Sequence, residues 1–139
     1  MYLLDTNVVS ELRRPGKAAS AVLAWSRAAV ADQLFISSIT VFEIELGVRQ
    51  KERRDATQGR LLRQWLEMQV LPQFQGRVLD VDIAVARRCA ALHSPHPAPE
   101  RDAWIAATAL VHHMTVVSRN TRDFLACGAQ VFNPWLAPD

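Results

Sequence analysis

The sequence predicts an α/β protein, a three-layer α/β/α sandwich built on a mainly parallel sheet. Short apolar runs alternate with longer stretches of helical periodicity along all 139 residues. This alternation is typical of strand–helix–strand units, whose right-handed crossovers place parallel strands side by side and cover both faces of the sheet. Half of the residues are apolar and 22% are charged. We therefore expect residues 1–139 to form one domain around one core.

The predicted strands are short and nearly unbroken in apolar character, as strands buried on both faces should be. Tyr2, Leu3 and Leu4 form the first of them. The others are expected at residues 34–36, 78–79, 115–118 and 129–132.

The predicted helices carry apolar residues at a spacing of three and four. We expect Asn7 or Thr6 to cap the first helix, Ser37 or Ser38 the third, and Asp82 a later one. Three prolines between residues 94 and 99 exclude helix there. The helices are expected at residues 8–12, 18–29, 38–52, 56–68, 83–93, 101–111 and 121–125.

The charge is close to balanced, with a formal net charge of +2. Such a mildly basic chain tolerates contact with nucleic acid, but a strong electrostatic footprint would need clustered Lys and Arg. Asp5 interrupts the first apolar run, which is unlike a secretion signal. With no apolar stretch long enough for a membrane span, we expect a cytoplasmic protein.

Four acidic residues are predicted to meet at one edge of the sheet. Asp5 ends the first strand and Asp123 follows the strand at 115–118, so both lie at carboxyl ends. Glu43 is in the first turns of the helix after the second strand. Asp102 opens the helix that runs back to the 115–118 strand. Ligand sites of open α/β sheets lie at this edge.

Helical phase supports the inward direction of two of these carboxylates. Glu43 is expected to share a face with Ile39, Leu46 and Gly47 and to pack toward the sheet, with Gly47 leaving room beside it. Asp102 is likewise expected to share a helix face with the apolar residues at 105, 106 and 109 and to pack toward the sheet. A carboxylate on an inward face is costly unless something satisfies it, and a hard divalent cation would do so.

The expected cation is Mg²⁺, with Mn²⁺ as a substitute, because both prefer oxygen ligands and keep bound waters. Such an ion can orient a water and neutralise charge on a phosphodiester in the transition state. The acidic cluster therefore predicts a metal-dependent nuclease.

With these residues in view, the chain resembles the PIN-domain family, and within it the VapC-type ribonuclease toxins of type II toxin–antitoxin pairs. The resemblance covers almost the whole chain. Its motifs are Tyr2-Leu3-Leu4-Asp5-Thr6-Asn7, Ser38-Ile39-Thr40-Val41-Phe42-Glu43, Arg101-Asp102-Ala103-Trp104-Ile105-Ala106-Ala107, Val117-Ser118-Arg119-Asn120-Thr121-Arg122-Asp123-Phe124 and Val131-Phe132-Asn133-Pro134-Trp135.

This resemblance implies an α/β/α fold and Mg²⁺- or Mn²⁺-dependent cleavage of RNA. It also implies a homodimer and inhibition by a cognate antitoxin whose tail occupies the active-site groove. Asp5 and Asp102 would be the principal metal ligands and Glu43 would complete the centre. The fourth position is either Asp123 or Asn120, because some relatives carry the acid at the place of Asn120.

Two other classes of function fit part of the pattern. The chain could be a catalytically weak module that holds RNA or the antitoxin in the same groove, and Asn120 is the feature that favours this. A phosphatase with an aspartyl nucleophile would need a second Asp two residues after Asp5, where Asn7 stands. A zinc site at His93 and His96 is disfavoured by the surrounding prolines and the lack of a cysteine pair.

Overall fold

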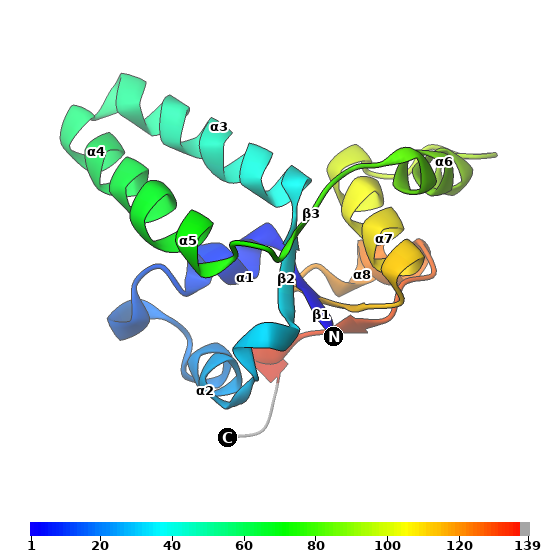
Figure 1. The fold of residues 1–139 in the computed structure, drawn as a ribbon, viewed down its shortest axis with the longest axis horizontal. Coiled ribbons are helices and arrows are strands. Elements are labelled where there is room, and N and C mark those ends of the chain that lie inside the picture. The colour runs from blue at the N-terminus through cyan, green and yellow to red at the C-terminus, as the bar shows by residue number, and fades with distance from the viewer. Residues whose placement is uncertain (137–139) are drawn as a thin grey trace.

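The computed structural model describes residues 1–136, which form a five-stranded sheet flanked by helices (Figure 1). The strand order is β3-β2-β1-β4-β5, and each neighbouring pair is parallel. The predicted fold class is thereby confirmed. The strands are β1 (Tyr2–Leu4), β2 (Leu34–Ser37), β3 (Val78–Leu79), β4 (Thr115–Val117) and β5 (Val131–Phe132).

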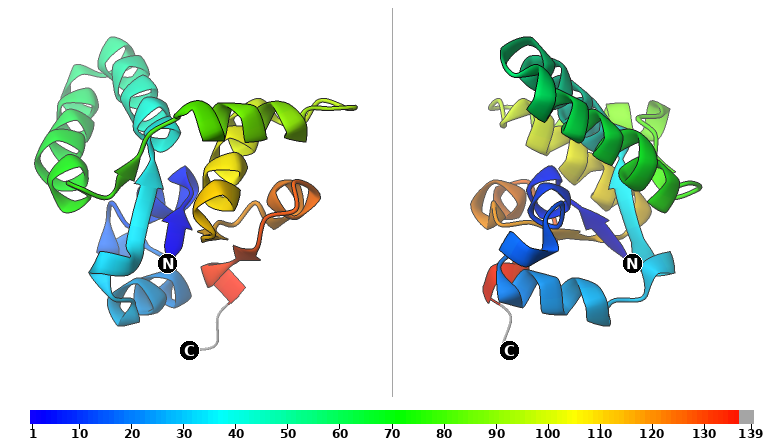
Figure 2. Two further views of the ribbon diagram at one scale, coloured as in Figure 1. Left: turned by 45° about the vertical axis from the view of Figure 1, so that its right-hand side comes forward. Right: turned by 90° about the vertical axis from the view of Figure 1, so that its left-hand side faces the viewer.

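The helices lie on both sides of this twisted sheet, as the two rotated views show (Figure 2). Alternate residues of β1 point into the two apolar layers. Leu4 belongs to the cluster that contains residues of α1 (Thr6–Glu11) and α3 (Ser38–Arg54), and Leu3 to the cluster that contains residues of α7 (Glu100–His112) and α8 (Thr121–Ala126). The helices are α1 (Thr6–Glu11), α2 (Ser20–Ala28), α3 (Ser38–Arg54), α4 (Ala56–Trp65), α5 (Leu71–Gln73), α6 (Ile83–Leu92), α7 (Glu100–His112) and α8 (Thr121–Ala126).

The strand register brings the ends of the central strands level. Leu4 pairs with Val117, so Asp5 and Ser118 follow β1 and β4 at the same height. The backbone N–H of Asp5 donates to the carbonyl of Val117 at 2.9 Å. The sheet thus extends its hydrogen bonding up to the residues where the acidic cluster begins.

The cap of α1 differs from the prediction. Asp5, not Thr6 or Asn7, is the N-cap residue, and its Oδ1 accepts a hydrogen bond from the Thr6 N–H at 2.8 Å. A carboxylate satisfies an orphan N–H as well as a hydroxyl or amide does, so the helix begins directly at the strand end. The predicted caps Ser37 and Asp82 are confirmed.

The buried face of α3 also differs from the prediction. Thr40, Ile44 and Val48 form its buried stripe, whereas Ile39 and Leu46 are only half-buried. Gly47 is exposed, and a Cβ added there would meet nothing within 4 Å. α3 packs against both the sheet and the antiparallel α4. Its buried face is therefore rotated from the one expected for a helix that packs on the sheet alone.

The helix expected at residues 56–68 continues further. After α4 the chain passes through a π-helical stretch, Leu66–Val70, and then α5. Leu66 and Val70, at the two ends of this stretch, both lie in the core, where they are 1% and 2% exposed. None of the helices in the described part of the chain is long and apolar enough to cross a membrane.

Candidate metal centre

The four predicted acidic residues come from four separate segments and gather beyond the carboxyl ends of β1 and β4. Asp5 follows β1 and is 5% exposed. Glu43 lies in the second turn of α3, Asp102 in the first turn of α7 and Asp123 in the first turn of α8. The last three are half-buried. Each carboxylate is thus fixed by an element that begins or ends at this edge.

Asp5 is held by hydrogen bonds on both oxygens. The Ser118 hydroxyl donates to Oδ2 at 2.7 Å, and the Asn7 amide donates to the same oxygen at 3.3 Å. Oδ1 accepts from the Thr6 N–H. Burial raises the pKa of Asp5 above its ordinary value, the bonds from Ser118 and Thr6 oppose that rise, and repulsion from Glu43 adds to it.

Glu43 is held between a hydroxyl and a guanidinium. The Thr6 Oγ1 donates to its Oε1 at 2.7 Å, and the Thr40 Oγ1 lies 3.1 Å from the Thr6 Oγ1. Because a hydroxyl has one proton, Thr6 accepts from the fully buried Thr40 while it donates to Glu43. On the other side, the Arg101 Nη1 lies 3.6 Å from the Glu43 Oε2.

Asp102 and Asp123 share one donor. The Asn120 Nδ2 donates to Asp102 Oδ2 at 2.6 Å and to Asp123 Oδ2 at 3.0 Å. Burial raises the pKa of Asp102 to about 6, with further increases from the charges of Asp5, Asp123 and Glu43, while the bond from Asn120 lowers it. The carboxylates are therefore close enough to repel one another.

The chemistry of this donor set fits a hard divalent cation, because the side chains facing the edge offer carboxylate, hydroxyl and amide oxygens. As the side chains stand, no three His, Cys, Asp or Glu residues of the segment 1–136 are arranged to hold one ion together. Glu43 turns to Thr6 and Arg101, and the amide of Asn120 lies against Asp102 and Asp123. Joint ligation requires these side chains to rotate.

Comparison with known proteins agrees with this architecture. The sequence model of the PIN domain family matches residues 2–128. The chain belongs to the PIN domain family. The match includes β1, β2 and β4 and all four acidic residues, so the fold is that of a PIN domain.

This PIN domain is similar over nearly its whole length to proteins from two bacteria. Toxin FitB from Neisseria gonorrhoeae is 40% identical over 141 residues, covering 97% of this chain and 99% of the relative. VapC ribonuclease Y4jK from Sinorhizobium fredii is 38% identical over 143 residues, covering 97% and 98%. The crystal structure of FitAcB from Neisseria gonorrhoeae superposes with a TM-score of 0.89 at 38% identity, covering 99% and 100%.

Sequence reasoning missed the polar residues that support the acidic ones in this PIN domain. Ser118 is fully buried and bonds both to Asp5 and to the backbone N–H of Asn120, at 2.9 Å. A hydroxyl at the end of the apolar Val116–Val117 run was the available signal. Thr6 and Thr40 carry no such signal, because their contact joins α1 to α3 across 34 residues.

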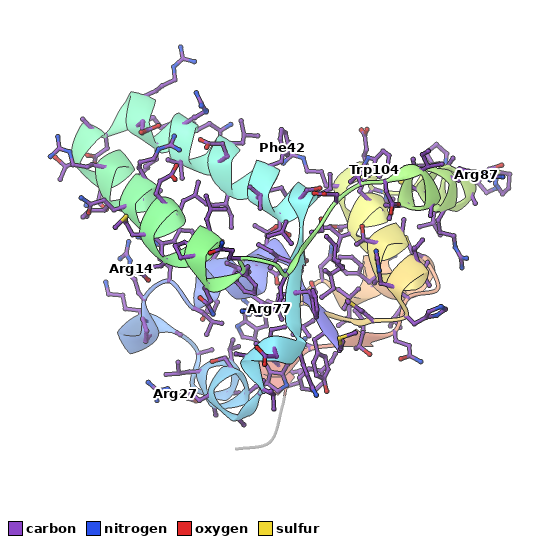
Figure 3. All side chains as sticks on the ribbon, viewed as in Figure 1. Arg14, Arg27, Phe42, Arg77, Arg87 and Trp104 are labelled. Carbon is purple, nitrogen blue, oxygen red and sulfur yellow. The ribbon has the colours of Figure 1, made fainter. Side chains whose placement is uncertain are left out.

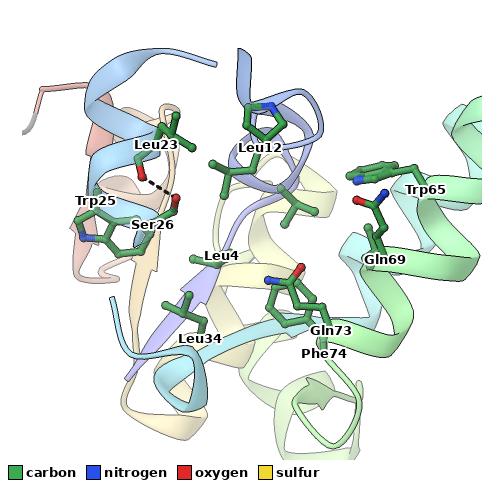
Figure 4. A pocket seen from close by; sticks show the side chains of 13 residues that line it. Leu4, Leu12, Leu23, Trp25, Ser26, Leu34, Trp65, Gln69, Gln73 and Phe74 are labelled. Carbon is green, nitrogen blue, oxygen red and sulfur yellow. Dashed lines mark hydrogen bonds between the residues drawn. The ribbon is translucent and has the colours of Figure 1, made fainter. Parts of the chain in front are cut away.

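An apolar cavity of about 240 Å³ lies elsewhere, between α1, α2 and the segment from α4 to α5 (Figure 4). Leu12, Trp25, Trp65 and Phe74 contribute to its wall, together with the polar side chains of Gln69 and Gln73. No acidic residue lines it. The cavity is therefore separate from the candidate metal centre.

Proposed function

We propose that this PIN domain is a metal-dependent endoribonuclease and the toxin of a toxin–antitoxin pair. Asp5, Glu43, Asp102 and Asp123 hold the ion, which is Mg²⁺ or, as a substitute, Mn²⁺. One observation carries the proposal: carboxylates from four segments distant in sequence gather at the carboxyl edge of a parallel sheet, where burial first and then their charges raise the pKa of Asp102. Family membership and the names of the relatives, a toxin and a VapC ribonuclease, support it.

The cost of gathering these carboxylates is the physical argument for an ion. Like charges at this spacing destabilise the folded chain unless protons or a cation neutralise them. When bound, a divalent ion supplies a Lewis acid that polarises a phosphoryl oxygen and lowers the pKa of a bound water. Ser118 fixes the direction of Asp5, and Thr6 keeps Glu43 at the same edge, from which Glu43 would rotate to reach the ion.

The reaction that fits this arrangement is hydrolysis of an RNA phosphodiester by water. One P–O bond forms to the water oxygen, one P–O bond to the leaving sugar oxygen breaks, and no covalent bond to the protein is needed. The chain contributes acceptors for the proton of the attacking water, since the carboxylates at this edge are bases. The pKa of about 6 belongs to Asp102 in the chain without an ion, where burial raises it first and the neighbouring carboxylates add to it.

The partners follow from the same proposed function. We propose that the chain acts on RNA in the cytoplasm and is neutralised there by a cognate antitoxin. We further propose that residues 1–139 act as one domain and that the protein is a homodimer. Light scattering on the purified chain measures the oligomeric state directly.

A catalytically weak module that holds RNA or the antitoxin is the second candidate. The observation that favours it is the amide of Asn120, which hydrogen-bonds to Asp102 and Asp123 and neutralises part of their repulsion without an ion. In that case Asn120 would replace the cation rather than assist it. Binding of RNA would then occur without cleavage.

The test compares cleavage of an RNA panel by the wild type and by Asp5→Asn, with and without Mg²⁺. We expect the variant to lose at least about 100-fold in rate, the scale seen when one electrostatic contributor is removed from an active site. Asp32→Asn is the matched control, because Asp32 is exposed and lies before β2, at the other edge of the sheet. Equal cleavage by wild type and Asp5→Asn rejects the proposal, and RNA binding without cleavage favours the module.

A further inference from the structure

Two arginines beside the acidic cluster are held over aromatic rings. Arg101 precedes Asp102, and its guanidinium carbon lies 5.2 Å from the centre of the Phe42 ring. Arg119 precedes Asn120, and its guanidinium carbon lies 5.2 Å from the centre of a Trp135 ring. A guanidinium over an aromatic ring is attracted to the ring, and its N–H groups can still donate to another acceptor.

Arg101 is positioned to exchange one anion for another. Its side chain is 51% exposed, and its only ion pair in the described segment is the loose 3.6 Å contact with Glu43. Phe42, which supports it, is itself 52% exposed. Figure 3 shows Phe42 on α3 and Trp104 on α7. Arg101 belongs to α7, and the contacts described above reach across to Phe42 and Glu43 on α3.

Arg119 lies on the other flank of the site. The strand order β2-β1-β4-β5 places α3 after β2, Asp5 after β1, Arg119 after β4 and Trp135 after β5. The backbone N–H of Arg119 donates to Asn7 Oδ1 at 3.4 Å, and Asn133 Oδ1 accepts from the Trp135 N–H at 3.0 Å. The backbone of Arg119 is thus tied to α1 beside the carboxylates, and Trp135 follows the carboxyl end of β5, the neighbouring strand.

The acidic cluster by itself repels a polyanion. Asp5, Glu43, Asp102 and Asp123 carry more negative charge than one divalent ion neutralises, so an RNA strand needs further positive charge to approach. Exposed guanidiniums on the two flanks supply it, and each can donate two N–H groups to a phosphate. A protein segment rich in acidic side chains would bind the same arginines, but nothing would attract it across the carboxylates that lie between them.

We infer that Arg101 and Arg119 form a backbone-binding site for single-stranded RNA, contacting phosphates on either side of the one at the acidic cluster. The inference rests on the proposed ribonuclease function and adds the path of the strand: across the carboxyl edge, from the Phe42 flank to the Trp135 flank. Binding of the strand replaces the contact between Arg101 and Glu43 by one between Arg101 and a phosphate.

The test measures binding of a short labelled single-stranded RNA across a series of KCl concentrations at fixed Mg²⁺. All proteins carry Asp5→Asn so that the probe stays intact. Each phosphate contact contributes about 0.7 to the slope of log affinity against log salt for a single strand. We expect Arg101→Gln and Arg119→Gln each to reduce the slope by about 0.7 and the double variant by about 1.4.

Matched variants separate this contact from general charge. Arg87→Gln removes an exposed arginine from α6, away from Phe42 (Figure 3), and should leave the slope unchanged. Arg101→Lys and Arg119→Lys keep the charge and should retain most of the slope. A polyglutamate peptide is the probe for an acidic protein segment. The inference is overturned if the salt slope does not change in the glutamine variants. It is also overturned if these variants lose polyglutamate binding while their RNA binding stays intact.

Cleavage by the otherwise wild-type chain, measured on the same RNA, keeps the two proposals apart. If the chain does not cleave but the glutamine variants lose slope, the backbone-binding site stands and the ribonuclease proposal fails. If the chain cleaves and the slopes of all variants agree, only the backbone-binding site is rejected.

Discussion

The side-chain amide of Asn120 lies 2.6 Å from Asp102 and donates a hydrogen bond to its carboxylate. Its nitrogen also donates to Asp123 at 3.0 Å. A neutral amide therefore joins two carboxylates that repel each other, and it does so with partial positive charge alone. The pKa of Asp102 remains raised, to about 6, because burial and three neighbouring carboxylates outweigh this bond.

Asn120→Asp should strengthen ion binding. The change replaces the donor by a further carboxylate, so without an ion the pKa of Asp102 should rise further, and with an ion the site gains a charged ligand. Carboxyl titration by NMR measures the pKa, and calorimetry with Mn²⁺ measures the affinity. Asn120→Ala is the control, because it removes the donor without adding a ligand. Equal Mn²⁺ affinity in Asn120→Asp and Asn120→Ala would show that this position does not face the ion.

The raised pKa of Asp102 predicts a specific dependence of stability on pH. A carboxyl whose folded pKa lies above its unfolded value of 3.8 favours folding when protonated, and this contribution is lost as pH rises through about 6. Compared with Asp102→Asn, whose amide does not titrate, the ion-free wild type should therefore lose stability between pH 4 and pH 7. Thermal unfolding of both proteins across this range, in the presence of a chelator, measures the difference.

A divalent ion should reverse that trend. Protons compete with the ion for Asp102, so ion affinity should fall as pH decreases through about 6. A wild-type melting temperature that tracks Asp102→Asn at every pH without an ion would contradict the raised pKa.

The sequence predicted the positions of those site residues that lie at the ends of strands or at the starts of helices. Asp5 and Asp102 could be placed because the carboxyl edge of a parallel sheet follows from strand–helix alternation alone. The supporting hydroxyls could not, since Thr6 meets Thr40 only through the packing of α1 on α3. The predicted buried face of α3 was wrong for a related reason. Besides the sheet, α3 packs against the antiparallel α4, and the periodicity within α3 does not reveal this second neighbour.

Thr6→Val should weaken ion binding while preserving the fold. Valine has nearly the same shape, but it removes the hydroxyl that donates to Glu43 and accepts from Thr40. Glu43 is then free to move toward Arg101. Loss of a group that orients a metal ligand typically costs 10–100-fold in metal affinity, and we expect a loss of about 10-fold in Mn²⁺ affinity. Thr6→Ser restores the hydroxyl and should restore the affinity, which a purely steric role of the threonine methyl would not predict.

Two glycines on the α3–α4 hairpin should respond to alanine in opposite directions. Gly59 on α4 is buried, and a Cβ there would lie 2.5 Å from the Glu52 Cα on α3, so the helices must separate. Overpacking of this kind costs about 1–3 kcal/mol. Gly47 on α3 is open, so Gly47→Ala should stabilise by up to about 1 kcal/mol through helix propensity alone. Denaturant unfolding of both variants measures the two changes in free energy. Equal shifts of the same sign would mean that α3 and α4 do not approach closely at Gly59.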